Sequence, residues 1–550
     1  MSGWLSHESS ALEFDLVIIG AGINGAAVAR DASMRGLRVL LLEKNDIGSG
    51  TTAWSTRLIH GGLRYLEHAE IGLVRESLRE REILLRIAPH LVKPIPIVLP
   101  IYVGQRRGSF TVRTGMIAYD LLSFDKSLNA HRRLSRSELL LLAPGINQEG
   151  LRSAFLYYDA QVEFAERLTL ETVLSAVENG AQVKTYATVD GFLTADERIN
   201  GVTYTDQLTG KRFDVRSRLI INASGPWVDL LLDGSHPSSA PPLIGGTKGS
   251  HLIVQSFSGA PTTAVYVEAA VDHRPIFVIP WNGKYLIGTT DIRYSGSLDN
   301  VVISEQEIEY LLNETNRLFP TAHLSRDSIL FTYSGIRPLA YANNKDEEAI
   351  TRRHFIHEDP LNGLISLVGG KLTTHRRLAA QTVDLCCRRL AREVPESATA
   401  TIRLPGACPP DFAGFDEQFK EQSPLPTFGA ERLLRVYGFR ALQILRLAGK
   451  DKELLQPFDA ETAAIAAEVV FAFKEEMATT LADCLLRRTM VGLNSTCGLD
   501  AVEATAAIAQ KYLGWSNEKS TGEIEGYRRE VNRRLTQMTK IQSGQPNPAS

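Results

Sequence analysis

Residues 15–25 read Asp15-Leu-Val-Ile-Ile-Gly20-Ala-Gly22-Ile-Asn-Gly25, and Val39-Leu-Leu-Leu-Glu43 follows them. The two apolar runs predict β-strands, and the alanine-rich segment between them predicts a helix. The glycines fit a turn that binds a dinucleotide: Gly20 makes the turn, Gly22 lets the backbone approach a pyrophosphate, and Gly25 lets the helix pack against the sheet. The helix N-terminus would hold the phosphates. A buried βαβ unit without a ligand is the alternative.

Glu43 ends the second strand and is placed to accept hydrogen bonds from the ribose hydroxyls of an adenosine. An acidic residue there disfavours a 2′-phosphate, so NAD or FAD is expected in preference to NADP. The following loop crowds serine and threonine beside glycines, and Ser55 and Thr56 would donate to phosphate and ribitol oxygens. Gly61-Gly62, one residue before Arg64-Tyr65, is a pattern that could direct a guanidinium into a site. A flexible surface loop is the alternative.

The chain has 550 residues, 44% hydrophobic and 22% charged, which is the composition of a globular protein with roughly two to four domains. The net charge of −3 argues against a nucleic-acid partner held by bulk electrostatics. Five cysteines, including the adjacent Cys386 and Cys387, show no metal-ligand spacing, so a reduced compartment and no metal are expected. No run approaches the roughly 20 apolar residues of a transmembrane helix, and residues 1–12 lack the apolar stretch of a signal peptide.

Two downstream segments are predicted to return to the first sheet. Leu219-Ile-Ile-Asn222-Ala-Ser-Gly225-Pro-Trp227 reads as a buried strand that ends in a glycine turn, and Leu364-Ile-Ser-Leu-Val-Gly369-Gly370-Lys371 repeats the pattern. In a doubly wound sheet such turns lie against the cofactor at the carboxyl edge. The cofactor domain is therefore expected to be discontinuous, and a helix N-terminus at 371–373 would stabilise negative charge on a reduced ring. An ordinary strand end is the alternative at Gly225.

Residues 245–339 predict an antiparallel sheet, interrupted by a helix that starts with a capping box at Ser304 and runs to Leu318. The strands are expected at 251–254, 264–267, 276–279, 285–288 and 329–333. Charged residues at the strand ends are the candidates for chemistry, namely Lys248, His251, Asp291 and Arg337.

Three other segments are interpreted in structural terms. The helix expected within 66–89 alternates arginine and glutamate between leucines, which predicts a solvated face with ion pairs. Residues 94–103 are rich in β-formers but contain prolines, which favours edge strands. Gln105-Arg-Arg107 precedes an apolar helix near 112–122, and this basic stretch either forms an ordinary loop or rests on an anionic membrane.

Beyond Arg392 a proline-rich linker precedes helices rich in alanine and leucine, expected over 431–447, 461–490, 499–513 and 523–539, and residues 544–550 are expected to be a disordered tail. The fold class expected is α/β plus α. It comprises a discontinuous Rossmann-type cofactor domain at 13–90, 150–230 and 362–392, an antiparallel-sheet substrate domain at 91–149 and 231–361, and a C-terminal helical domain at 405–540.

Together these motifs resemble the FAD-dependent glycerol-3-phosphate dehydrogenases, respiratory enzymes within the D-amino-acid-oxidase-like flavoprotein superfamily. The glycine turn alone supports only the superfamily, although the return of two downstream turns to one cofactor also favours FAD over a nicotinamide. Ser224 stands where the family commonly has threonine, which keeps the hydroxyl. The more specific motifs are Leu58-Ile-His60-Gly-Gly-Leu-Arg64-Tyr65-Leu66-Glu67, Asn222-Ala-Ser-Gly-Pro-Trp227, Thr247-Lys-Gly-Ser-His251, Gly288-Thr-Thr-Asp291, Ser334-Gly-Ile-Arg337-Pro-Leu339, Gly369-Gly-Lys371-Leu-Thr and Leu486-Arg-Arg-Thr489.

The resemblance implies that sn-glycerol 3-phosphate is oxidised to dihydroxyacetone phosphate at FAD and that the electrons pass to a membrane quinone. It implies that Arg64, Tyr65, His251, Arg337 and Lys371 surround the substrate, with the last three as catalytic residues. Cations suit a dianionic phosphate, and an imidazole titrates near neutral pH, so His251 is the expected base. Lys371 or a water molecule is the alternative base.

The residues expected to bind FAD come from the motifs above. They are Gly20, Gly22, Asn24, Gly25, Glu43, Lys44, Thr52, Ser55, Thr56, Leu58, His60, Gly61, Gly62, Val189, Ala223, Gly225, Trp227, Gly370, Lys371, Leu372 and Thr373.

Three other functions compete with this interpretation. A glycerol-3-phosphate oxidase would pass electrons to O₂ and produce H₂O₂, an amine oxidase of the superfamily would need a carboxylate clamp, and a scaffold protein would bind FAD without turnover. The expected partners are the substrate, a quinone, a peripheral membrane contact and a second copy in a homodimer, with no nucleic acid. The expected location is the cytoplasm, peripheral on the inner face of the cytoplasmic membrane.

Overall fold

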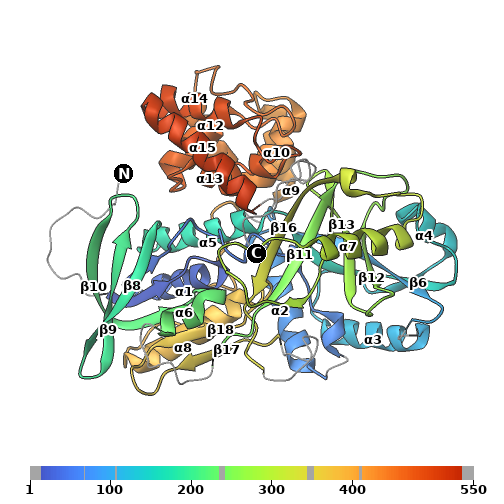
Figure 1. Cartoon of the computed structure of the whole chain (residues 1–550), viewed down its shortest axis with the longest axis horizontal. Helices are drawn as coiled ribbons and strands as arrows, with labels where there is room; N and C mark the ends of the chain where they lie inside the picture. Colours follow the sequence, from blue (N-terminus) through green and yellow to red (C-terminus); the bar gives the residue numbers. More distant parts are fainter. Residues whose placement is uncertain are drawn as a thin grey trace.

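The structure is a computed structural model that describes residues 14–66, 69–105, 108–233, 242–342, 352–407 and 412–534. Two sheets lie side by side, and the C-terminal helices pack over them at one side (Figure 1). This arrangement agrees with the expected fold class of a discontinuous Rossmann-type domain, a second sheet domain and a helical domain.

The first sheet carries the glycine turn. Its strand order is β17 (Phe355–Glu358), β18 (Ile365–Val368), β10 (Lys211–Asn222), β1 (Phe14–Ile19), β2 (Val39–Leu42) and β7 (Gln182–Lys184), with β8 (Ala187–Ala195) and β9 (Arg198–Asp206) joined through β10. β1 pairs in parallel with β2 and β10, and β10 pairs in parallel with β18. The segment near residue 365 therefore completes a sheet that begins at residue 14.

Alternation along β1 explains how this sheet is covered on both faces. Leu16 and Ile18 pack against α1 (Ile23–Met34), α5 (Ala165–Glu178) and α8 (His375–Arg389). Val17 and Ile19 point to the other face and pack against residues of β8 and β9. Successive side chains of a strand point to opposite faces of the sheet. A strand that is apolar throughout must therefore be covered on both faces.

The second sheet is antiparallel except where β4 meets β12. Its order is β15 (Ile292–Arg293), β11 (Thr247–Val254), β14 (Lys284–Gly288), β13 (Pro275–Trp281), β12 (Ala264–Glu268), β4 (Val92–Tyr102), β6 (Leu151–Val162) and β3 (Leu58–Ile59), with β16 (Ile329–Arg337) on β11 and β5 (Arg132–Leu134) on β6. The helices around it are α2 (Ile71–Ile87), α3 (Ser109–Leu122), α4 (Arg136–Leu142) and α7 (Glu305–Leu318), while the short α6 (Val228–Asp233) follows β10. The capping box predicted at Ser304 is present, with Glu307 as its partner.

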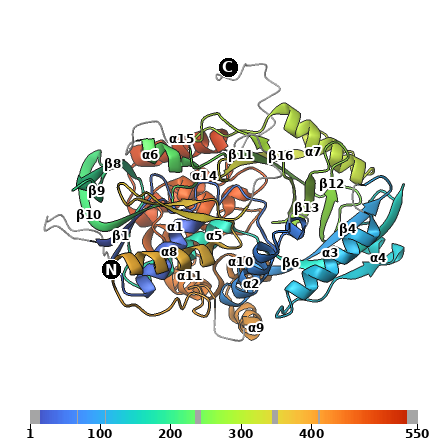
Figure 2. The same cartoon turned by 90° about the horizontal axis from the view of Figure 1, so that it is seen from below.

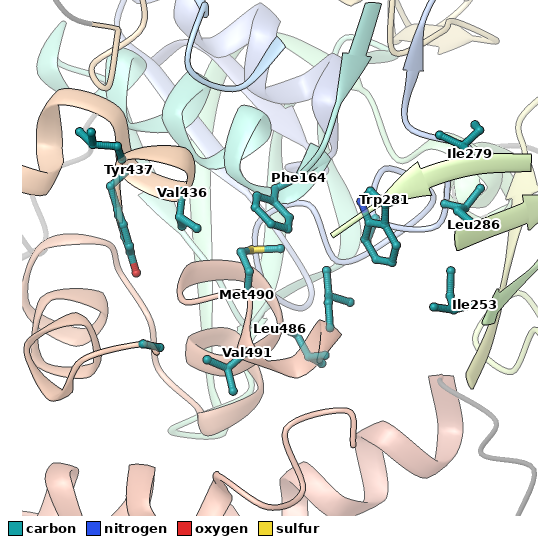
Figure 3. Close-up of a cluster of buried hydrophobic side chains, with 14 of the residues drawn as sticks. Phe164, Ile253, Ile279, Trp281, Leu286, Val436, Tyr437, Leu486, Met490 and Val491 are labelled. Atoms are coloured by element: carbon teal, nitrogen blue, oxygen red, sulfur yellow. The ribbon is translucent and has the colours of Figure 1, made fainter. Parts of the chain in front are cut away.

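The C-terminal helical domain contains α9 (Phe412–Gln422), α10 (Thr427–Tyr437), α11 (Ala441–Ala448), α12 (Ala466–Glu475), α13 (Leu481–Asp483), a π-helical turn (Cys484–Arg488), α14 (Val502–Leu513) and α15 (Asn517–Arg534). Its core is continuous with that of the second sheet: Val436, Leu486 and Met490 belong to the same buried cluster as Ile253 and Trp281 (Figure 3). None of the helices in the described part of the chain is both long enough and apolar enough to span a bilayer.

Two C-terminal helices predicted as continuous are interrupted. The helix expected over 431–447 breaks at Gly438, whose φ of 55° a helix cannot accommodate. The helix expected over 461–490 is divided into α12, α13 and the π-helical turn. Alanine and leucine content predicts helix formation but not where a helix stops, because that depends on packing.

The interpretation of residues 66–89 as a solvated helix face was wrong for its centre. Glu80, Arg81 and Glu82 of α2 are 2%, 0% and 8% exposed. Arg81 pairs with Asp159, and Glu80 pairs with Arg376, from segments far along the chain. Local charge alternation cannot reveal such partners.

Strands β4 and β6 also differ from expectation. β4 lies between β6 and β12 and is not an edge strand, although β12 pairs only with its residues Ile97 and Val98, which leaves Pro94 and Pro100 unpaired on that side. β3 and β6 hydrogen-bond within the second sheet. The domain bounds predicted from the sequence, 13–90 and 150–230, instead place both strands in the cofactor domain. Residues 1–12, Arg106, Arg107 and the tail at 544–550 lie outside the described residues.

Candidate active site

A cavity of about 380 Å³ lies at the carboxyl edge of the first sheet, where β1, β2, β10 and β18 end. Gly20 makes the turn after β1 with a φ of +104°, and a β-carbon there would lie 2.8 Å from Ala223 O. A β-carbon on Gly25 would lie 1.9 Å from Gly20 O. The turn therefore tolerates glycine alone at both positions, as the sequence predicts.

The groups lining this cavity fit a dinucleotide. α1 starts at Ile23 without a side-chain cap, so its N-terminus can hold phosphate. Asn24 Oδ1 and Trp227 Nε1 are buried, and neither has a hydrogen-bond partner among the described residues. Glu43 accepts from Ala21 N at 2.7 Å and from Asn45 N at 2.9 Å, so the carboxylate predicted to bind ribose is fixed beside the turn.

A second cavity, of about 580 Å³, opens between the two sheets. Thr51, Ser55, Pro338, Gly370 and Lys371 line both cavities, so the two adjoin. A long cofactor can therefore reach from the glycine turn into the space between the sheets, where polar side chains of the second sheet face it.

His251 of β11 contributes an imidazole to the second cavity. Its Nε2 is hydrogen-bonded to Thr56 Oγ1 at 2.9 Å, and its Nδ1 has no partner among the described residues. The ring lies 4.9 Å from that of Tyr333, whose hydroxyl donates to Ser55 O. Burial, with a smaller effect of Arg337, lowers the pKa of His251 well below its usual value. The imidazole is therefore neutral and able to accept a proton.

Three arginines converge on Asp291. Arg337 donates to Asp291 Oδ1 at 3.0 Å, Arg352 donates to Oδ2 at 2.7 Å, and Arg274 donates to its backbone oxygen. Burial raises the pKa of Asp291, but the opposing effect of Arg337 and Arg352 is larger. The pKa is therefore lowered, and the carboxylate is charged. Arg274 also pairs with Asp272 at 3.5 Å, so two carboxylates among three guanidinium groups leave an excess of positive charge at the cavity wall.

Lys371 lines the same cavity and follows the second glycine turn. Its Nζ lies 3.7 Å from the centre of the Tyr65 ring and has no hydrogen-bond partner within the described part of the chain. Burial lowers the pKa of Lys371 to about 7. Gly62 allows Tyr65 this position, because a β-carbon at Gly62 would lie 2.0 Å from the tyrosine ring.

Most of the residues expected at the cofactor line one of the two cavities. Gly25 and Gly61 do not: Gly25 packs against the turn, and Gly61 N donates to Tyr119 Oη and Asp159. Lys248, a candidate for chemistry, is instead paired with Glu307 at 2.7 Å. The side chain of Arg64 lies outside the described residues, as does Glu67. The predicted residues that line a cavity are Gly20, Gly22, Asn24, Glu43, Lys44, Thr52, Ser55, Thr56, Leu58, His60, Gly62, Tyr65, Val189, Ala223, Gly225, Trp227, His251, Arg337, Gly370, Lys371, Leu372 and Thr373.

Sequence reasoning missed Arg274 and Arg352. Neither belongs to a glycine-rich motif. Arg274 reaches the cavity through the pairing of the second sheet, and Arg352 reaches it where the chain returns toward β17. The helix expected to start at 371–373 begins at His375, so Lys371 precedes the helix.

Comparison with known proteins places this geometry in a family. Residues 15–376 match the family described as FAD-dependent oxidoreductase, and residues 397–520 match the C-terminal domain of alpha-glycerophosphate oxidase. The chain is 45% identical to a glycerol-3-phosphate dehydrogenase of Synechocystis sp. over 94% of this chain and 95% of that protein. It is 33% identical to an aerobic glycerol-3-phosphate dehydrogenase of Staphylococcus aureus, over 98% and 96% of the two chains.

A solved structure is also similar over nearly its whole length. The glycerol-3-phosphate dehydrogenase from Bacillus halodurans, complexed with FAD, aligns with a TM-score of 0.78 and 28% identity and covers 95% of both chains.

Proposed function

The chain belongs to the FAD-dependent oxidoreductases that carry a glycerophosphate-oxidase-type C-terminal domain, and on that premise we propose that it oxidises sn-glycerol 3-phosphate to dihydroxyacetone phosphate. The observation that carries the proposal is the second cavity, where the three arginines around Asp291 line the same space as Lys371 and the neutral His251, beside the cofactor cavity. Such a charge pattern suits a small dianionic phosphate that carries an oxidisable hydroxyl.

The basic residues would bind the phosphate and orient the substrate. Arginine binds two phosphate oxygens at once, and the arginines around Asp291 are held in place before the substrate arrives. Lys371 lines the same cavity beside Tyr65 and would add a further positive charge for the phosphate.

His251 would take the proton of the substrate hydroxyl. Its depressed pKa keeps it neutral, and its hydrogen bond to Thr56 fixes the ring. FAD, when bound, supplies the acceptor for the hydride that leaves the carbon bearing this hydroxyl. The orphaned polar atoms and the helix N-terminus at the glycine turn support the binding of its pyrophosphate and adenosine there.

Anaerobic mixing tests this function directly. We expect sn-glycerol 3-phosphate to bleach the flavin absorbance of the purified protein, whereas glycerol, which lacks the phosphate, should not at the same concentration. An unbleached flavin would contradict the proposed substrate, and bleaching by an amino acid would favour the amine-oxidase alternative.

We further propose a membrane quinone as the electron acceptor, in keeping with the dehydrogenase names of the full-length relatives. The oxidase alternative predicts one H₂O₂ for each substrate molecule in air. If a quinone is the acceptor, a soluble quinone analogue should reoxidise the flavin and restore its colour much faster than air-saturated buffer does. Stoichiometric peroxide would favour the oxidase.

The apolar face of α3 supports a peripheral membrane contact. Phe110, Ile117, Leu121 and the adjacent Phe124 are 83%, 45%, 70% and 79% exposed, and their spacing places them on one side of the helix. The opposite side packs into the core through Val112, Met116 and Tyr119. α3 lies at the periphery of the molecule (Figure 2), so this apolar face can reach the interfacial region of a bilayer without a spanning helix.

A further inference from the structure

A buried carboxylate connects the cofactor loop with the C-terminal domain. Asp46 is 1% exposed and lies in the loop that links Glu43 to Thr52 along the first cavity. Arg487 Nε donates to Asp46 Oδ2 at 2.5 Å, and Arg488 donates to both carboxylate oxygens at 2.7 and 2.8 Å. All three side chains are buried, so the contact is a fully enclosed ion cluster.

The two arginines belong to the π-helical turn Cys484–Arg488. Wide turns of this kind are uncommon and often lie at functional positions. Here consecutive arginines reach the same carboxylate, while Arg488 Nε also donates to Glu476 O at 2.8 Å and Asp483 accepts from Arg487 at 2.8 Å. Both guanidinium groups are therefore also held by contacts within the C-terminal domain.

On the other side, the loop is bonded to the glycine turn itself. Gly48 N donates to Ala21 O at 3.0 Å, and Ile23 N donates to Thr52 Oγ1 at 3.1 Å. Glu43 bonds with the amides of Ala21 and Asn45 on either side. A shift of Asp46 would therefore move the groups that line the adenosine end of the cofactor cavity.

A second contact joins the same parts through Tyr186. Its hydroxyl donates to Asp483 Oδ1 at 2.6 Å, and its backbone N donates to Asn45 O at 3.0 Å. The next residue, Ala187, donates to Glu43 O at 2.8 Å and lines the cavity. The C-terminal domain thus reaches the adenosine end from two directions.

Charge makes the loop dependent on these contacts. Burial would raise the pKa of Asp46, but Arg488 and Arg487 lower it, so the buried carboxylate is ionised. A buried charge without its partners is costly, so the loop would leave its position if the arginines were lost.

We propose that Arg487 and Arg488 of the C-terminal domain position the loop Glu43–Thr52 and thereby control the affinity for the adenosine half of FAD. The inference rests on the FAD dependence of the family and not on the proposed substrate. It gives the C-terminal domain a role in cofactor retention, through positioning residues that do not line the cavity.

Cofactor titration of the deflavinated full-length protein tests the inference. Arg488→Lys and Asp46→Asn should each raise the Kd for FAD about tenfold or more, the scale expected when charged hydrogen bonds that position a binding loop are lost. The Kd for ADP, which contains only the adenosine half, should rise by a similar factor. Combining the two substitutions should add little, because both break the same contact.

Arg35→Lys is the matched control. Arg35 is buried and paired with Asp31 and Asp384 at the far end of α1, and it lines neither cavity. We expect it to lower the melting temperature of the apoprotein without a comparable change in the Kd for FAD. Equal weakening by Arg35→Lys, or an unchanged FAD affinity in Arg488→Lys, would overturn the inference.

Tyr186→Phe provides a test that does not depend on the arginine variants folding. It removes only the hydroxyl that donates to Asp483, and it should raise the Kd for both FAD and ADP by a smaller factor. Unchanged affinity for both ligands in Tyr186→Phe would also count against the inference.

Discussion

Gly249 lies directly beneath the guanidinium group of Arg337: a β-carbon at residue 249 would lie 2.2 Å from Arg337 Nη2. The two residues belong to the paired strands β11 and β16, and Arg337 extends across β11 to Thr289 Oγ1 and Thr290 O. The bare backbone at Gly249 is therefore what allows this arginine to lie along the cavity wall.

Gly249→Ala should displace Arg337 and weaken substrate binding. We expect KM to rise about tenfold or more, since a charged hydrogen bond contributes about 1.5–3 kcal/mol, while the FAD content stays unchanged. Steady-state kinetics and the ratio of flavin to protein check both. Gly191→Ala is the control, because a β-carbon there meets nothing within 4 Å. An unaltered KM in Gly249→Ala would argue against a role for Arg337 in binding.

His251→Asn should slow flavin reduction about a hundredfold or more, as loss of a general base does. Anaerobic stopped-flow measurement of the reduction rate at saturating substrate checks this. His90→Asn is the control, because His90 is buried and paired with Glu171 but lines neither active-site cavity. Reduction at a near-normal rate in His251→Asn would transfer the role of base to Lys371 or water.

The pKa of Lys371, lowered to about 7, predicts a pH dependence. The amine is charged below that pH and neutral above it, so its attraction for phosphate is lost as pH rises. We expect kcat/KM, which reports on the free enzyme, to fall as pH rises through about 7. Lys371→Arg should remove this decline, because a guanidinium stays charged. If kcat/KM falls with rising pH in the variant as it does in the wild type, Lys371 is not the cause of the decline.

Glu166→Gln should destabilise the protein, because it leaves Arg57 buried without its charge partner. Arg57 and Glu166 are 0% and 2% exposed, with two hydrogen bonds of 2.7 Å, and the guanidinium lies 4.8 Å from the Trp281 ring. Breaking such a pair costs about 3–5 kcal/mol, which corresponds to a fall in melting temperature of about 3–4 °C for a chain of 550 residues. Glu453→Gln, which breaks an exposed pair with Lys511, should leave the melting temperature unchanged.

The apolar face of α3 gives a prediction for membrane binding. Phe110→Ser combined with Leu121→Ser should reduce cosedimentation with anionic vesicles about tenfold or more, because two large apolar side chains no longer enter the interface. Turnover with a soluble quinone analogue should be unaffected. Leu208→Ser, at an exposed residue in the turn between β9 and β10, is the control. Equal vesicle binding by all variants would exclude α3 as the contact.

The sequence by itself determined the glycine turn at the carboxyl edge of the first sheet. Gly20, Gly25 and Glu43 are close in the chain, and their roles follow from backbone geometry over one strand, turn and helix. The strands of the second sheet and the capped α7 were also predictable, because period-two alternation and capping boxes are local signals. His251 and Arg337 were predictable as cavity residues because each lies in a motif of a known family, although His251 lies within β11 and only Arg337 ends its strand.

Only the tertiary structure decided which charges are paired and which face the cavity. Arg274 and Arg352 reach Asp291 from separate segments, and Glu80 is buried because Arg376 covers it from 296 residues away. The contact between Asp46 and Arg488 spans 442 residues. A charged residue looks the same in sequence whether it is solvated or enclosed, because the free energy of burying it depends on partners that the fold supplies from elsewhere in the chain.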